Sequence, residues 1–397
     1  MHADRSGDPN FPQGLRIQPS SLQRHPQIRA HRETTYEDHR QEALQDEQQA
    51  GKVTQTASWE QDTPEDIESF GIAGRIWEAA YLLARYLRPA VQHPDELEFD
   101  PPCSLFEPAS SKQPLTIVEL GSGAGYGSLH LARQLLQHAQ CTKSQPAKAT
   151  LVLTDLENVV PLMERNVARA GYQQTTSLLE VSVRSLAWGN DAHAAALLSE
   201  LRPIESGGGV IGAQMNPLTH ILCSDLVYFP ELLPPLLRSI VLLSAYGLGS
   251  EDSKRGPELI ISYKIRSLTK EQPFWSALDS WFDFRAVDCR PRPRPSDGHS
   301  TNHQADVSES HWHRFGSEGE DYGASAASDQ ELFVFVGHRR KETIGCLAPE
   351  SDTELMQGKR LRPRQGPEGD AVFDLESSSG QGYFEWLLLA NMGAGLG

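Results

Sequence analysis

The chain has 397 residues, of which 38% are hydrophobic, below the roughly 45–50% apolar share of ordinary globular proteins. An apolar core is therefore expected in only part of the chain, diluted by polar segments. Asp and Glu number 53 against 36 Lys and Arg, so the formal net charge is −17. Because affinity for nucleic acid depends on neutralising phosphates with basic residues, this charge argues against a nucleic-acid partner.

The five cysteines are widely spaced along the chain and form no Cys-x-x-Cys pair. This argues against a disulfide framework and against a cysteine-based zinc site. The first residues lack the apolar run of a signal peptide, and no stretch approaches the roughly 18 apolar residues that span a bilayer. We therefore expect a soluble protein of the cytoplasm or the nucleus, without a membrane partner.

The first part of the chain is polar. Residues 1–70 are expected to form a disordered leader, because their apolar side chains are too few to offset the entropy of ordering. An apolar face at helical spacing, which includes Trp77, then predicts a helix over 74–89.

Short apolar segments alternate with helical patterns in the middle of the chain. We predict strands at 115–120, 149–154, 178–183, 220–224, 258–263, 284–287 and 331–336. We predict one helix that follows the glycine run after the first strand and ends near 138, and further helices at 157–170, 231–244 and 274–282. This alternation predicts an α/β domain with a mostly parallel sheet covered on both faces. The domain covers 71–342, with polar loop inserts at 93–114, 202–217 and 290–330. The tail at 343–397 is expected to be mostly disordered, with one docking helix or strand at 383–390.

A glycine-rich segment follows the first of these strands and precedes a helix. It contains Glu119, Gly121, Ser122, Gly123 and Gly125. Glycine permits a tight turn and a close approach of the backbone to a ligand. A dinucleotide fingerprint would need glycine at 126, where this chain has tyrosine. The residues instead resemble the Glu-x-Gly-x-Gly-x-Gly loop that binds S-adenosylmethionine, with a purely structural turn as the alternative.

Two side chains beyond this loop fit a nucleoside. Asp155 ends the next strand, where a carboxylate can accept hydrogen bonds from both ribose hydroxyls. The alternative is an N-cap for the helix at 157–170, and both roles can coexist. Trp188 follows the third strand, where its indole would either wall an adenine pocket or cover the edge of the sheet.

The fourth strand ends in Ser224, and Asp225 and Tyr228 follow it. Ligands of open α/β sheets bind at the carboxyl ends of parallel strands. Asp225 and Tyr228 are therefore candidates to hold an amine-bearing substrate, with a cap for the helix near 231 as the alternative for Asp225. His311 and His313 lie in a low-complexity loop without further ligands, so no metal site is predicted.

These motifs occur in the order found in the family 16 seven-strand protein lysine methyltransferases, and the chain resembles that family over about 70–342. The resemblance is closest to the methyltransferase-like 21 group and its fungal relatives. It rests on Trp77, Glu119 to Gly125, Thr154-Asp155-Leu156, Leu186-x-Trp188-Gly189, Ser224-Asp225-x-x-Tyr228 and Ser262-Tyr263-Lys264. Ala187 stands where family members often carry an acid, and the inserts and tails are longer than usual.

The resemblance implies a seven-strand Rossmann-like sheet, S-adenosylmethionine as methyl donor, and transfer to the side-chain amine of a lysine in a protein such as a translation factor or chaperone. It places the cofactor contacts on Trp77, Gly121, Gly123, Asp155, Trp188 and Ser224, and the acceptor signature on Asp225 and Tyr228. A monomer is expected. Two alternatives stay open: methylation of another acceptor, either histidine or a small molecule, and a donor-binding interaction module without catalysis.

Overall fold

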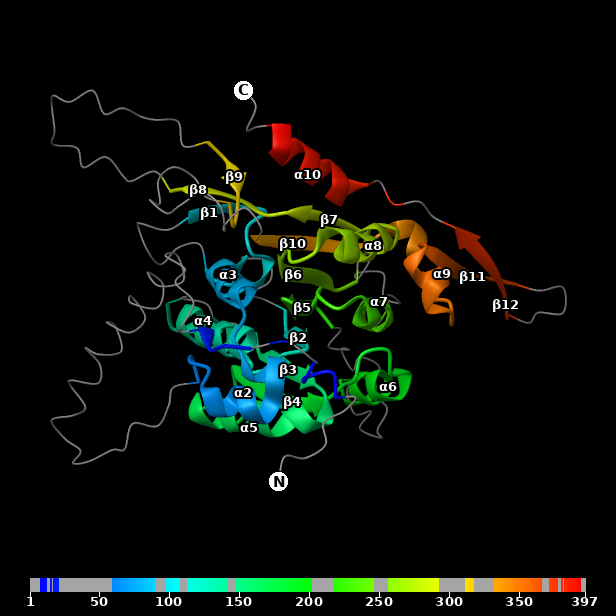
Figure 1. Cartoon of the computed structure of the whole chain (residues 1–397). Helices are drawn as coiled ribbons and strands as arrows, with labels where there is room; N and C mark the ends of the chain where they lie inside the picture. Colours follow the sequence, from blue (N-terminus) through cyan, green and yellow to red (C-terminus); the bar gives the residue numbers. More distant parts are fainter. Residues whose placement is uncertain are drawn as a thin grey trace, which may run out of the picture.

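The computed structural model describes residues 8–12, 15, 17–20, 59–89, 97–107, 113–141, 147–201, 218–245, 256–292, 311–317, 332–365, 371–377, 380 and 382–393. A central sheet with helices on both faces forms the body of the molecule (Figure 1). Within the described ranges, no helix combines the length and the apolar character that crossing a bilayer requires.

The central sheet has seven strands in the order β4-β3-β2-β5-β6-β10-β7. The strands from β4 to β6 run parallel, whereas β10 is antiparallel to both of its neighbours, β6 and β7. This confirms the predicted α/β class and the seven-strand, mostly parallel sheet. The strands are β2 (Leu115–Leu120), β3 (Ala149–Asp155), β4 (Leu179–Ser185), β5 (His220–Ser224), β6 (Glu258–Lys264), β7 (Phe282–Ala286) and β10 (Leu332–Arg339).

The two faces of the sheet are covered by separate helix layers (Figure 1). Alternate residues of β2 point to opposite faces, so Ile117 packs in the layer of α3 and α4, and Val118 packs in the layer of α7 and α8. One layer has α3 (Glu78–Tyr86), α4 (Tyr126–Cys141) and α5 (Val160–Arg169), and the other has α6 (Asp191–Glu200), α7 (Leu233–Ser244) and α8 (Leu268–Asp279). α6 is an element that the sequence did not predict, because its alanine-rich segment has little apolar periodicity.

Regular structure begins before the predicted boundary at Gly71. α2 (Pro64–Phe70) lies within the predicted leader, and its N-cap Thr63 accepts a hydrogen bond from the backbone N–H of Asp66 at Oγ1. Farther upstream, Ser20 donates a hydrogen bond from Oγ to Oδ1 of Asp62 at 2.7 Å. Composition underestimates order in this region because the ordering contacts are made with residues that are distant in the sequence.

Two of the predicted loop inserts meet in space. From the first, β1 (Leu97–Asp100) pairs antiparallel with β8 (Asp288–Pro291), and β8 pairs with β9 (His313–Arg314) from the last. Phe315 is 2% exposed, and its ring packs edge to face on an aromatic ring of β1 at 4.8 Å between centroids. These parts of the inserts therefore belong to the packed structure, whereas the insert at 202–217 lies outside the described residues.

The C-terminal extension also contains regular elements rather than being mostly disordered. These are α9 (Asp352–Met356), β11 (Lys359–Gln365), β12 (Ala371–Ser377) and α10 (Tyr383–Gly393). Of the two alternatives for 383–390, the helix is the one present. It docks through Phe384, which is fully buried and stacks on Trp275 of α8 at 5.0 Å between ring centroids. The extension therefore adds to the core on the side of α8.

Candidate active site

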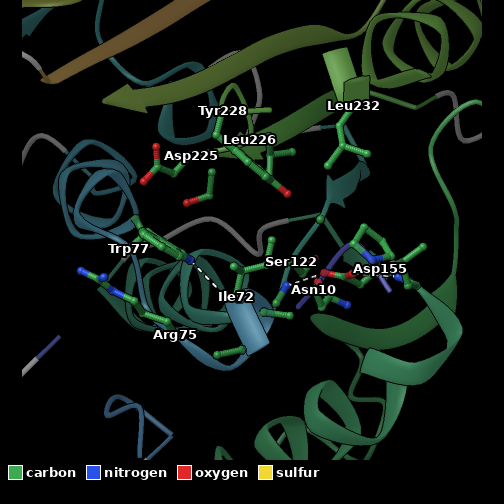
Figure 2. Close-up of a pocket in the computed structure, with 18 of the residues that line it drawn as sticks. Asn10, Ile72, Arg75, Trp77, Ser122, Asp155, Asp225, Leu226, Tyr228 and Leu232 are labelled. Atoms are coloured by element: carbon green, nitrogen blue, oxygen red, sulfur yellow. Dashed lines mark hydrogen bonds between the residues drawn. The ribbon is translucent and has the colours of Figure 1, made fainter. Parts of the chain in front are cut away.

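A cavity of about 270 Å³ lies where β2, β3 and β5 end at their carboxyl sides. Figure 2 shows this pocket, with Trp77 and Asp225 on one side and Asp155 on the other. Gly125 is the one predicted site residue that does not line it. The predicted residues that do are Trp77, Glu119, Gly121, Ser122, Gly123, Asp155, Trp188, Ser224, Asp225 and Tyr228.

The glycine loop between β2 and α4 requires glycine for two reasons. Gly121, Gly123 and Gly125 have φ values of +56°, +52° and +77°, in the left-handed region that favours glycine. A Cβ at Gly121 would also lie 2.7 Å from Cζ2 of Trp188. Gly125 faces Leu153 instead of the cavity, and a Cβ at Gly125 would lie 2.8 Å from Cδ2 of Leu153. Gly125 therefore serves the packing of the loop on the sheet.

Polar contacts fix the loop from inside. Ser122 Oγ donates to the backbone oxygen of Glu119 at 3.2 Å and accepts from the N–H of Thr154 at 3.1 Å. Glu119 is 1% exposed, and its Oε2 accepts from the backbone N–H of Ser128 in α4 at 3.3 Å. Burial raises the pKa of Glu119 to about 7. A cation bound near this carboxyl would favour its ionised form.

Asp155 closes the other side of the loop. Its Oδ2 accepts from the N–H of Gly123 at 2.8 Å, and its Oδ1 accepts from the N–H of Leu156 at 2.7 Å. Burial raises the pKa of Asp155 to about 6. The helix-cap alternative does not describe this geometry, because the turn at Glu157–Val159 has Leu156 as its N-cap and no side-chain cap. Each carboxylate oxygen keeps a lone pair for a ligand hydroxyl.

Asp225, directly after β5, is held by a residue that the sequence motifs did not indicate. Its φ is +61°, a conformation that Asp and Asn adopt more readily than most side chains. Its two carboxylate oxygens accept hydrogen bonds from Nη1 and Nη2 of Arg266 at 2.7 and 2.5 Å. The Asp225 side chain is 0% exposed and that of Arg266 is 28% exposed. Asp225 therefore binds a guanidinium and does not cap the helix near 231.

Trp77 is the N-cap residue of α3. The sequence predicts it inside a helix over 74–89, whereas the observed helix begins one residue later, at Glu78. Nε1 of Trp77 donates to the backbone oxygen of Ile72 at 2.9 Å. Two guanidinium carbons lie near its ring centroid, that of Arg75 at 4.2 Å and that of Arg266 at 5.2 Å, within the range of cation–π attraction. Arg75 also donates to Glu78 Oε1 at 2.7 Å. The indole is thus fixed at the cavity wall.

The remaining predicted residues close the side next to α7. Trp188 lines the cavity and also packs against the core of the α7–α8 layer, and its contact with an adenine ring stays a prediction. Ser224 Oγ is buried and has no hydrogen-bond partner among the described residues. The Tyr228 ring packs edge to face on Phe229, with 4.9 Å between centroids. Burial raises the pKa of the Tyr228 phenol, which therefore stays neutral near pH 7.

The charges around the cavity do not balance. Asp225 pairs with Arg266, and Arg75 pairs with Glu78. In the part of the chain that the structure describes, no ion pair joins Glu119 or Asp155, which both line the cavity, to a basic residue. Two carboxyl groups without a basic partner favour a ligand that carries positive charge.

Among the cavity residues that were absent from the sequence prediction, Arg266 and Asn10 are two with polar side chains. Arg266 lies two positions beyond the Ser262-Tyr263-Lys264 motif, and its partner Asp225 is 41 positions away in the chain. Asn10 reaches the cavity from the predicted leader. No local pattern marks either residue, because the contacts that place them are made across the fold.

Residues 58–202 match the family model described as lysine methyltransferase, which confirms the resemblance to that family for this part of the chain. Solved structures similar to the chain include an O-methyltransferase family 2 protein from Planctomyces limnophilus in complex with apigenin, at 12% identity, with 51% of this chain and 42% of that chain covered and a TM-score of 0.26. A putative methyltransferase from Thermoplasma acidophilum is 10% identical, with 59% and 72% covered and a TM-score of 0.26. Loganic acid methyltransferase with SAH is 9% identical, with 54% and 58% covered and a TM-score of 0.23. The chain spans 42% of the length of the first of these proteins.

Proposed function

From the match of residues 58–202 to the lysine methyltransferase family, and from the cavity just described, we propose that the chain transfers a methyl group from S-adenosylmethionine to the side-chain amine of a lysine in a protein. One observation carries the proposal: the glycine loop, Asp155 and the Asp225–Tyr228 segment line a single cavity. A donor and an acceptor bound there would be neighbours. The family resemblance implies a translation factor or a chaperone as the substrate, for a monomer acting in the cytoplasm or the nucleus.

The residues around the cavity fit this donor. Asp155 offers carboxylate lone pairs to ribose hydroxyls, and the indole of Trp188 offers a flat wall to an adenine ring. Ser224 Oγ is a buried polar atom that lacks a partner among the described residues and would gain one. Glu119 and Asp155 supply the negative charge that a sulfonium and an α-ammonium group require.

When bound, S-adenosylmethionine supplies an electrophilic methyl group on a sulfonium. The protein has to present a neutral amine to it, because a lysine ammonium with a pKa of about 10.4 carries no free lone pair. The apolar walls formed by Leu226, Phe229 and Leu232 exclude water and disfavour the ammonium form, so they depress the pKa of a lysine that enters. We assign proton removal to water rather than to an obligate side-chain base.

Tyr228 and Asp225 have different parts in this scheme. Tyr228 has a neutral phenol at the cavity, which can hydrogen-bond an amine nitrogen or wall the lysine channel. Asp225 uses both oxygens on Arg266, and Arg266 in turn contacts the ring of Trp77. Asp225 therefore acts mainly by fixing the β5 loop against the start of α3, and its direct contact with the acceptor amine stays a prediction.

The proposal is tested by incubating the protein with methyl-labelled donor and a proteome extract, then hydrolysing the labelled proteins to amino acids. We expect the label in methyl-lysine, and a large loss of label with Asp155→Ala, which weakens the donor site. Label in methyl-histidine, or in a small molecule, would identify another acceptor. Binding of donor without any label transfer would identify an interaction module.

A further inference from the structure

A segment of the predicted leader forms one edge of the cavity. We call residues 8–20, as far as they are described, the N-terminal strap. Pro9, Asn10 and Leu15 of the strap line the same cavity as the glycine loop and Asp155. In Figure 2, Asn10 lies on the side of the pocket where Asp155 lies.

The first part of the strap is tied down on both sides of the cavity edge. Asp8 Oδ2 accepts a hydrogen bond from Nδ2 of Asn158 at 2.9 Å, in the turn that follows Asp155. The backbone oxygen of Asn10 accepts from the N–H of Ile72 at 2.9 Å. Gly71 makes room for this contact, since a Cβ on it would lie only 1.8 Å from that oxygen. The strap therefore joins the segment after β3 to the segment before α3.

The far end of the strap is anchored more deeply. The Ser20 backbone N–H donates to Oδ2 of Asp62 at 2.9 Å, and the Ser20 hydroxyl lies 2.8 Å from the Tyr81 hydroxyl of α3. The same Asp62 oxygen accepts from the N–H of Ile76 at 3.1 Å. Ser20 and Ile76 thus both donate to the carboxylate of Asp62, which is buried at 6% exposure. This anchor holds the strap against the start of α3, beside Trp77.

The side chain of Asn10 is the part of the strap with unused hydrogen-bonding capacity. Asn10 is 5% exposed, and its backbone N–H donates to Oδ1 of Asp8 at 2.9 Å. Its Nδ2 is buried and has no hydrogen-bond partner among the described residues. A buried amide without a partner is unfavourable, so such a group at a cavity wall points to a ligand atom that accepts the bond.

We propose that Asn10 binds the adenosine half of the donor, through a hydrogen bond from its carboxamide to an acceptor on the ribose or the base. The inference rests on the proposed function. The adenosine half is assigned because the strap is tied to Asn158, three positions beyond Asp155, the carboxylate placed to hold the ribose. The strap thus contributes a binding residue to the site and belongs to the domain that holds it.

Calorimetric titration of the full-length protein with S-adenosylhomocysteine and with methylthioadenosine tests this inference. Methylthioadenosine keeps the adenosine half and lacks the amino-acid half. For Asn10→Ala we expect both ligands to bind about 2- to 12-fold more weakly, the range for one neutral hydrogen bond. Gln18→Ala is the matched control, because it removes an exposed carboxamide from the same strap and should leave both affinities unchanged.

Each outcome of this experiment has a distinct meaning. Unchanged affinities in a folded Asn10→Ala protein would overturn the inference and leave the proposed function intact. A loss seen with S-adenosylhomocysteine but not with methylthioadenosine would overturn the assignment to the adenosine half. Wild-type protein that binds neither ligand would contradict the proposed function itself. Increased protection of the strap from amide exchange on ligand binding, read in the wild type, is a second expected result, and its absence counts against the inference.

Discussion

Replacing Arg266 by Met removes the cation that both oxygens of Asp225 bind, at 2.7 and 2.5 Å. The carboxylate left behind has a side chain that is 0% exposed. Breaking a buried ion pair from one side costs about 3–5 kcal/mol. Because Arg266 is 28% exposed, water screens part of this cost. We expect a loss of about 2–3 kcal/mol in the free energy of unfolding, which lowers Tm by about 4–12 °C in a domain of this kind.

The matched control is the double variant Asp225→Asn, Arg266→Met. Asn retains the shape of Asp and tolerates the φ of +61°, but it leaves no buried charge. The double variant should therefore lose less stability than Arg266→Met alone. Denaturant unfolding of the wild type, both single variants and the double variant gives the coupling energy between the two residues. Additive losses, with a coupling energy near zero, would refute the proposed role of Arg266 as the group that neutralises Asp225.

Changes at three further positions test other parts of the site and fold. Asp155→Ala should weaken S-adenosylhomocysteine binding by about 10- to 150-fold, because charged hydrogen bonds to the ribose hydroxyls are lost. A calorimetric affinity equal to that of the wild type would exclude the ribose role of Asp155. The pKa of Asp155 is raised to about 6 from 3.8, so its ionised form is lost as pH falls. The affinity for S-adenosylhomocysteine should therefore decrease below about pH 6 in the wild type but not in Asp155→Asn. The contribution of Asp155 to folding stability has the opposite pH dependence: it is full below about pH 4 and is lost as pH rises through 6. Tyr228→Ala should lower the methyl-transfer rate far more than donor affinity, because it acts on the acceptor; an unchanged rate would make this motif structural. Phe315→Ala should lower the free energy of unfolding by about 3–5 kcal/mol, measured with denaturant. A loss near zero would show that the insert at 290–330 is a solvated loop.

The sheet and the donor loop could be predicted because their signals are local. Apolar runs at strand length mark β2 and β5, and the glycines from 121 to 125 lie together between a strand and a helix. Asp155 could be predicted for the same reason, since it directly ends a strand whose neighbour carries the loop. Parallel pairing then brings the ends of successive strands to one edge of the sheet.

The residues that were not predicted depend on contacts across the chain. Arg266 acquires its role only when β5 and β6 pair and bring its guanidinium to Asp225. Asn10 acquires its place only when the strap crosses the segment at Ile72. Phe315 lies in a stretch that is polar on average, and one buried aromatic ring does not change that average. Composition therefore assigns these segments to loops, although single residues in them are part of the packed fold.

The proposed function requires that the cavity between the glycine loop and Tyr228 holds the donor. Photo-crosslinking is the direct test of this requirement. The protein is irradiated with tritiated S-adenosylmethionine and digested, and the labelled peptide is identified. We predict label on a peptide that carries Trp188, Tyr228 or Phe229, which line the cavity, and loss of that label when S-adenosylhomocysteine competes. Label confined to peptides that contribute nothing to the cavity, or label that S-adenosylhomocysteine does not displace, would contradict this assignment.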